Sequence, residues 1–164
     1  MRIYLHIGLE HAGVERLQKV LADKREQLRG KGVLFPRAPG GKNHTRLFMA
    51  VTDPDHVDPL RFNRGFATAE QQEELYQRLG EDLQKEVAAA RPETLILSAS
   101  QLGAKLHRKS ELERLRKLIL PLSQDIRVLA HVADPVEALA QNYAGQILDG
   151  RDRDLRQELA LVEA

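Results

Sequence analysis

Hydrophobic residues cluster in three short runs of this chain, and these runs contain little polar alternation. They occupy residues 3–7, 94–97 and 126–132. A strand with one face in water alternates hydrophobic and polar side chains, whereas a strand covered on both faces is hydrophobic almost throughout. The three runs therefore predict strands of a parallel sheet that has helices on both faces.

Amphipathic patterns next to these runs predict helices. In residues 14–29, hydrophobic side chains recur on one helical face, and Gly30 and Gly32 end the pattern. Residues 33–36, with the sequence Val-Leu-Phe-Pro, then predict a short strand. The chain thus begins with a strand, a helix and a second, shorter strand.

Three pairs of residues have the spacing of a capping box, a mark of a helix start: Thr68 and Gln71, Ser110 and Glu113, and Asp134 and Glu137. They predict helices over residues 68–91, from residue 110 to about 120, and from Asp134 to near Gly150, although Gly80 interrupts the first pattern. The last helix is expected to turn hydrophobic side chains toward a core: Val136, Leu139, Tyr143, Ile147 and Leu148.

Strands that alternate with helices across short connections predict an α/β fold, here one domain over residues 1–164 with a parallel sheet flanked by helices. Residues 36–67 hold four of the seven prolines and are expected to form an irregular excursion over the site. Residues 151–164 predict a charged C-terminal helix. Ligands of such folds bind at the carboxyl ends of the strands, so the site is expected there.

Composition narrows the function classes. The net charge of +1 gives no reason to expect a nucleic-acid binder or a membrane-surface protein. Cysteine is absent from the sequence, which excludes disulfides, thiolate catalysis and cysteine-based metal sites. No hydrophobic stretch reaches the ~18 residues that a membrane-spanning helix needs, and the N-terminus lacks the features of a signal peptide. We expect a cytoplasmic location.

The strongest chemical signal is a loop between the first predicted strand and helix. Gly8 and Gly13 enclose four residues in the G-x-x-x-x-G spacing of loops whose backbone N–H groups bind phosphate. A complete P-loop continues with Lys and Ser or Thr, whereas this chain continues with Val14 and Glu15. The frame of a phosphate loop is present without its usual side chains.

Further motifs follow in a recognisable order: His6-Ile-Gly8 with Leu17-Gln18, then Gly32-Val-Leu-Phe-Pro36, Asn43-His44 with Leu47, the run 95–102, and Asn142-Tyr143 after the third strand. In this order, over residues 3–148, the chain resembles bacterial sulfotransferase-family proteins of the P-loop-like kind that use the sulfuryl donor PAPS. The resemblance implies a P-loop NTPase-like, sulfotransferase-like core of reduced size.

The same alignment shows which family side chains are replaced. In the family a Lys and the Thr residues after it hold the 5′-phosphosulfate, and an Arg and a Ser hold the 3′-phosphate. Their positions here are His11, Ala12, Val14, Glu15 and Arg16 in the loop, and Ala133 and Gln141 later in the chain. The Glu of the family's S-S-E motif is replaced by Ser100. Most of the PAPS-contacting side chains are therefore missing.

What remains is a candidate anion or nucleotide site composed of Gly8, His11, Gly13, Arg16 and Ser98, with PAPS or adenosine 3′,5′-bisphosphate as its candidate ligand. A helix N-terminus contributes ~0.3–1 kcal/mol toward a nearby anion. Glu15, in the first turn, can satisfy that terminus itself and would repel a phosphosulfate. His11 is at best a partly protonated substitute for Lys, because imidazole titrates near ~6.5. A self-capped helix without ligand is favoured over tight PAPS binding.

Two further groups of residues, the histidines and a basic segment, do not predict a binding site. His6, His11 and His44 have no carboxylate partner at metal-ligand spacing, so we expect no metal site, and His6 is expected to be a hydrogen-bonded core residue. The basic residues of segment 105–117 are interrupted by Glu111 and Glu113. A solvated helix face with ion pairs is therefore favoured over a site for an acidic ligand.

Two functional hypotheses follow. The first is a non-catalytic scaffold or interaction module that requires no cofactor and keeps at most a weak anion or nucleotide site. The alternative is a divergent sulfotransferase that transfers a sulfuryl group from PAPS to an unknown acceptor. In it, His11 would replace the Lys and His44 would be the catalytic base. The protein partner is unknown, and a homo-oligomer is compatible with either hypothesis.

Overall fold

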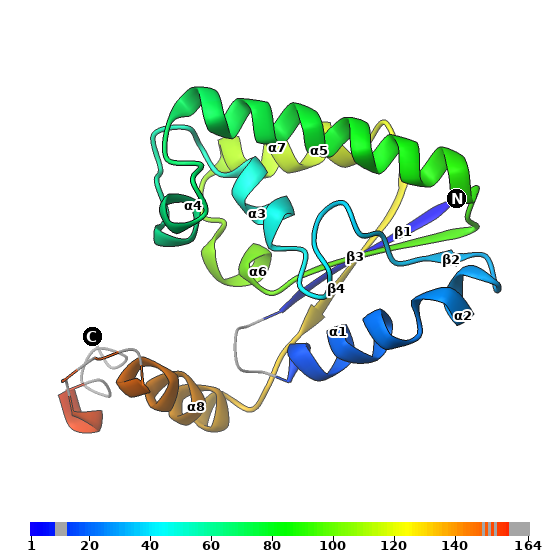
Figure 1. The fold of residues 1–164 in the computed structure, drawn as a ribbon. Helices are drawn as coiled ribbons and strands as arrows, with labels where there is room; N and C mark the ends of the chain where they lie inside the picture. The colour runs from blue at the N-terminus through cyan, green and yellow to red at the C-terminus, as the bar shows by residue number, and fades with distance from the viewer. Residues whose placement is uncertain (9–12, 149, 151, 153, 158–164) are drawn as a thin grey trace.

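The computed structural model describes residues 1–8, 13–148, 150, 152 and 154–157. Within them, four strands form one sheet in the order β2-β3-β1-β4, and each pair of neighbours is parallel (Figure 1). The strands are β1 (Arg2–Gly8), β2 (Val33–Leu34), β3 (Thr94–Ala99) and β4 (Asp125–His131). The predicted α/β class with a parallel sheet flanked by helices is confirmed, and so are the predicted strands.

The hydrophobic core lies on one face of this sheet. Ile3 of β1 pairs with Leu95 of β3 on one side and with Ile126 of β4 on the other, so their side chains share that face. Helices α3 (Thr45–Val51), α5 (Ala69–Ala90), α6 (Gln101–Lys105) and α7 (Lys109–Ile119) cover it. Helices α1 (Val14–Asp23) and α2 (Arg25–Arg29) lie on the opposite face (Figure 1).

Two predicted helices differ from the structure in detail. The helix expected over residues 14–29 is broken at Lys24, which separates α1 from α2. The long helix α5, by contrast, is continuous through Gly80, and its Thr68–Gln71 capping box is present. A Cβ at Gly80 would lie 3.3 Å from Leu118 of α7, so this glycine allows the two helices to approach closely.

The predicted capping box of Ser110 and Glu113 is wrong. Helix α7 begins at Lys109, and the carboxylate of Glu111 accepts hydrogen bonds from the backbone N–H groups of His107 and Arg108. The Ser110 hydroxyl instead bonds Asp53 at 2.7 Å. Two acidic residues, Glu111 and Glu113, lie close to this helix start in the sequence. Glu111 is the buried one, and it caps the helix.

The segment 36–67, expected to be irregular, contains two short helices, α3 and α4 (Pro59–Asn63). Five consecutive residues of α3 are buried in the core, from Leu47 to Val51. The buried Arg61 guanidinium donates to the backbone oxygens of Asp53 and His56, each at 2.8 Å, and so holds the loop between α3 and α4. The segment is thus part of the core and does not simply cover a site.

Helix α8 (Pro135–Leu148) begins as predicted, because the Asp134 carboxylate accepts from the backbone N–H groups of Val136 and Glu137. The expectation that this helix packs on the core is wrong. None of its described residues is buried, and Val136 is 76% exposed. Figure 1 shows α8 extending away from the sheet, beyond the end of β4. Most of the charged helix expected at 151–164 falls outside the described residues.

Strand β4 is also poorly covered. No residue of β4 is buried, although its hydrophobic run predicted a strand with two covered faces. One edge of β4 pairs with β1, and the sheet ends at the other edge within the described residues. Among these same residues, no helix is long and hydrophobic enough to cross a membrane.

A close backbone contact near the end of β1 provides a test of the fold. A Cβ added at Gly103 of α6 would lie 2.7 Å from the backbone oxygen of Gly8. We expect Gly103→Ala to lower the free energy of unfolding by about 1–3 kcal/mol, although alanine favours helices, because α6 must move away from β1. Gly41→Ala is the matched control, since a Cβ there meets nothing within 4 Å. Equal stability of the two variants in urea unfolding would contradict the contact.

Candidate functional site

The carboxyl ends of β1, β3 and β4 meet at one edge of the sheet, where the sequence placed the candidate site. Gly8 ends β1, and Gly13 caps α1 with a left-handed backbone, φ 83°. A Cβ at Gly8 would lie 2.4 Å from a methyl carbon of Val14, so this glycine is required for packing whether or not a ligand binds. His11 lies outside the described residues.

A buried polar cluster occupies the sheet behind this edge. The Ser98 hydroxyl of β3 is 2.8 Å from Nδ1 of His6 on β1 and accepts a 3.0 Å hydrogen bond from Nε2 of Gln18 on α1. The same Gln18 amide reaches Oδ1 of Asn43 at 3.3 Å. Three of these four side chains, those of His6, Gln18 and Ser98, are buried. Ser98 therefore bonds other side chains of the fold.

Asn43 extends the cluster to the start of α6. Its Nδ2 donates to Oγ of Ser100 at 3.2 Å and to Oε1 of Gln101 at 3.1 Å. Sequence reasoning did not select Gln18 or Asn43 as site residues. A signal existed for Gln18, because it is a polar residue on the buried face of α1, between Val14 and Leu21.

His44, the candidate base, is fully buried and stacks on Phe35, with ring centroids 4.5 Å apart. Its Nδ1 accepts the backbone N–H of Ser98 at 3.0 Å, so the ring proton resides on Nε2. Burial, and then the nearby positive charge of Arg25, lower the pKa of His44 to about 3. The buried ring of His44 therefore has no free lone pair and no access to solvent.

His6 is the hydrogen-bonded core histidine that the sequence led us to expect. It is buried on β1, and its ring meets that of His131 on β4 edge to face, at 5.7 Å between centroids. Burial, and then repulsion from His131, lower the pKa of His6. Among the described residues, no group of three metal-ligating side chains comes together.

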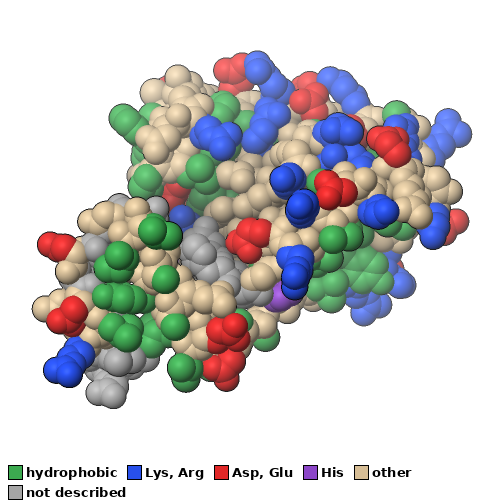
Figure 2. Space-filling view, turned by 60° about the horizontal axis from the view of Figure 1, so that its bottom comes forward, with side chains coloured by type: hydrophobic (Ala, Val, Ile, Leu, Met, Phe, Trp, Pro, Cys, Tyr) green, Lys and Arg blue, Asp and Glu red, His purple; other side chains and the backbone are tan. Residues whose placement is uncertain are grey.

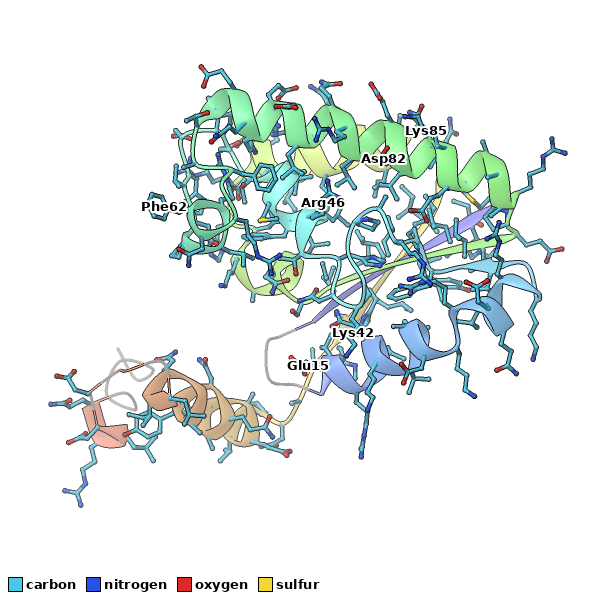
Figure 3. All side chains as sticks on the ribbon, viewed as in Figure 1. Glu15, Lys42, Arg46, Phe62, Asp82 and Lys85 are labelled. Carbon is cyan, nitrogen blue, oxygen red and sulfur yellow. The ribbon has the colours of Figure 1, made fainter. Side chains whose placement is uncertain are left out.

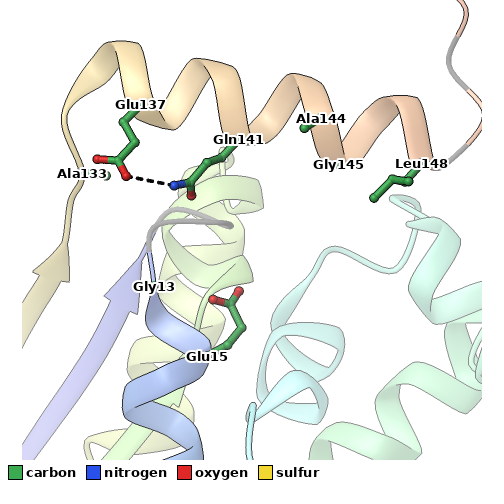
Figure 4. Close-up of a pocket in the computed structure, with 8 residues that line it drawn as sticks. All are labelled: Gly13, Glu15, Ala133, Glu137, Gln141, Ala144, Gly145 and Leu148. Atoms are coloured by element: carbon green, nitrogen blue, oxygen red, sulfur yellow. Dashed lines mark hydrogen bonds between the residues drawn. The ribbon is translucent and has the colours of Figure 1, made fainter.

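A pocket of about 610 Å³ lies beside the N-terminus of α1 (Figure 4). Its walls come from the start of α1 and from one side of α8: Gly13, Glu15, Ala133, Glu137, Gln141, Ala144, Gly145 and Leu148. Two of these lining residues are acidic, and none is a Lys or Arg. The side chain of Glu137 also accepts a 3.1 Å hydrogen bond from Gln141.

The remaining candidate residues do not converge on this pocket. Arg16 is exposed on α1 and does not line it, and Ser98 is buried in the polar cluster. Glu15, at the start of α1, does line it (Figure 4). Of the proposed anion-binding residues that the structure describes, only Gly13 lines the pocket.

Three basic residues of segment 105–117, namely Arg108, Lys109 and Arg114, form ion pairs, as the solvated-face interpretation predicted. Arg108 pairs with Asp53 at 3.3 Å and with Asp55 at 2.9 Å, and Lys109 lies 4.0 Å from Glu113. Burial of Glu111 would raise its pKa, but hydrogen bonds from His56 and the backbone lower it overall. The arrangement joins α7 to the loop before α4.

Comparison with known proteins gives no family for this chain. No protein-family model, no curated protein and no solved structure matches it.

The buried neutral state of His44 predicts a dependence of stability on pH. Its folded-state pKa of about 3 lies below the ordinary value of 6.5, so the unfolded chain binds more protons between these values. The contribution of His44 to stability is complete above pH ~6.5 and declines as the pH falls toward 3. We expect a loss from this residue of about 2.5 kcal/mol between pH 7 and pH 4.5.

Urea unfolding of the wild type and of His44→Asn at both pH values measures this effect. Asparagine keeps an acceptor near the position of Nδ1 but does not titrate, so the variant should lose less stability on acidification. Carboxylates titrate in both proteins and cancel in the difference. Parallel losses in the two proteins would show that His44 is protonated in the folded state or is accessible to solvent.

Proposed function

We propose that this chain is a non-catalytic interaction module on a frame similar to the sulfotransferase nucleotide-binding core, with at most a weak anion site. One observation carries the proposal. Gly13, Glu15, Ala133 and Gln141, which the resemblance aligns with phosphate-contacting parts of the family, all line one pocket. The location of a nucleotide site is thus supported, while its positive charge is missing.

The balance of charges favours the absence of tight nucleotide binding. A helix N-terminus offers an anion ~0.3–1 kcal/mol. A carboxylate about 4 Å from a phosphate opposes it by ~1 kcal/mol in water and by ~4 kcal/mol at a protein surface of effective dielectric 20. The pocket contains two carboxylates, those of Glu15 and Glu137, so repulsion exceeds the attraction of the helix terminus.

The divergent-transferase alternative receives less support. Its proposed base, His44, is buried, carries its proton on Nε2 and uses Nδ1 to accept a backbone N–H. Its proposed phosphate contact, Arg16, does not line the pocket. A role for His11 stays a prediction, because that residue is outside the described part of the chain.

Calorimetric titration with adenosine 3′,5′-bisphosphate at pH 6 and pH 8 tests the proposal. We expect no micromolar binding by the wild type at either pH. The double variant His11→Lys, Glu15→Thr should gain at least about tenfold in affinity, because it replaces one repulsive charge and supplies a cation. Micromolar binding by the wild type, above all if tighter at pH 6, would contradict the proposal and implicate a protonated His11.

A matched control separates a restored site from a general charge effect. Glu81→Gln with Gln84→Lys changes the net charge by the same amount on the exposed side of α5, remote from the pocket. This control should leave nucleotide affinity unchanged. If the double variant gains no more than the control, the frame around Gly8 and Gly13 does not correspond to a phosphate loop.

A further inference from the structure

Helix α8 presents a hydrophobic surface of exposed and half-buried side chains, none of which is fully covered by the described structure. Its residues fall on two sides of the helix, since side chains three or four apart share a face. One side lines the pocket beside α1. The other, here named the α8 stripe, consists of Val136, Leu139, Ala140, Tyr143 and Ile147. Figure 2 shows hydrophobic side chains gathered on the part of the molecule that α8 forms.

A hydrophobic groove of about 280 Å³ lies elsewhere on the same chain, between α7 and the two strands β1 and β4. It is here named the β4–α7 groove. Leu5, Leu112, Ile126 and Val128 are among the residues that line it, and Arg116 is the one charged residue among them. Val128 is 58% exposed. A parallel sheet is ordinarily covered on both faces, so this exposed part of β4 is the place where a covering element is missing.

The stripe and the groove are both hydrophobic, and α8 is about as long as β4, the strand that borders the groove. The 14 residues of α8 extend for about 21 Å, and the seven residues of β4 for about 23 Å. Hydrophobic side chains at intervals of three and four residues are the pattern with which a helix fills a hydrophobic groove. Glu137 is the only charged residue of α8, and it flanks the stripe. Arg116, in the groove, forms no ion pair with another described residue.

The geometry favours a helix from another copy over the chain's own α8. In each chain, the opposite side of α8 lines the pocket with Gly13 and Glu15, at the carboxyl ends of the strands. Only residues 132–134 connect β4 to α8. A helix placed there cannot also lie in the groove of its own chain, whereas its stripe remains open to a second copy. An exchange in which each chain gives and receives α8 is self-complementary, as a twofold dimer requires.

We propose that the partner of this interaction module is a second copy of the chain, with the α8 stripe of each copy docked in the β4–α7 groove of the other. The proposal rests on the proposed function, for which it names the partner. Glu137 then lies near Arg116 of the other copy, which places the start of α8 at that end of the groove. The docked helix covers Val128 and the neighbouring hydrophobic side chains of β4.

Analytical ultracentrifugation of the full chain from about 1 to 100 μM measures the association. We expect a dimer in the wild type and at least about tenfold weaker association in Val128→Asp and in Ile147→Lys. Both replaced side chains are exposed, and circular dichroism confirms that the variants fold. The matched control is Phe62→Asp on α4, whose side chain is 67% exposed and points away from the molecule (Figure 3). It should associate like the wild type.

Charge reversal tests the orientation of the docked helix. Glu137→Arg and Arg116→Glu should each weaken the dimer, and the two together should restore it. If the double variant is no stronger than the single ones, the proposed direction of α8 in the groove is wrong.

Mixing two variants tests the exchange itself. Val128→Asp keeps its stripe and Ile147→Lys keeps its groove, so a mixture of the two can form one intact helix–groove contact that neither variant forms alone. We expect association of the mixture to exceed that of either variant. A wild type that stays monomeric at 100 μM, or a mixture that gains nothing, overturns the proposal of a second copy.

The nucleotide titration, carried out on the wild-type protein, separates the two proposals. A monomer that binds no nucleotide overturns the second-copy proposal alone. A dimer with micromolar affinity for adenosine 3′,5′-bisphosphate overturns the non-catalytic assignment and leaves the interface in place.

Discussion

The hydrogen bonds around Ser98 hold the carboxyl end of this sheet together. The hydroxyl of Ser98 connects β3 to His6 of β1 and to Gln18 of α1. The backbone N–H and C=O of Ser98 connect β3 to His44 at the start of α3. These groups are buried, and a buried polar group that loses its partner costs about 1–3 kcal/mol. The positions of α1 and α3 relative to the sheet, and hence the walls of the site, depend on this cluster.

The same cluster explains why polar residues near strand ends do not by themselves indicate catalysis here. In an α/β fold, the carboxyl ends of the strands are where ligands bind, so His6, His44 and Ser98 attract attention in the sequence. In the structure the Ser98 hydroxyl bonds Nδ1 of His6, and Nδ1 of His44 accepts a backbone N–H, while the adjacent pocket presents Glu15 and Glu137. A site rich in polar residues thus leaves an acidic surface for any incoming phosphate.

In contrast to the buried polar cluster, β4 and α8 expose hydrophobic side chains. β4 and α8 have compositions suited to burial, yet neither contains a buried residue among those described. Such surfaces on a folded protein mark places where other surfaces bind. Since the sheet is otherwise well covered, much of the exposed hydrophobic surface of the described residues lies at one edge of the fold.

Features that depend on local chemistry could be predicted from the amino-acid pattern. The strands around Ile3, Leu95 and Ile126 follow from hydrophobic runs, and the helix starts at Thr68 and Asp134 follow from side chains that bond backbone groups within three residues. Tertiary structure decided which residue caps α7, that α3 is buried and that α8 is exposed. Tertiary contacts also bring Gln18 and Asn43 into the polar cluster around Ser98. These outcomes depend on contacts between residues far apart in the chain, and a periodic pattern shows that a face is hydrophobic without showing what will cover it.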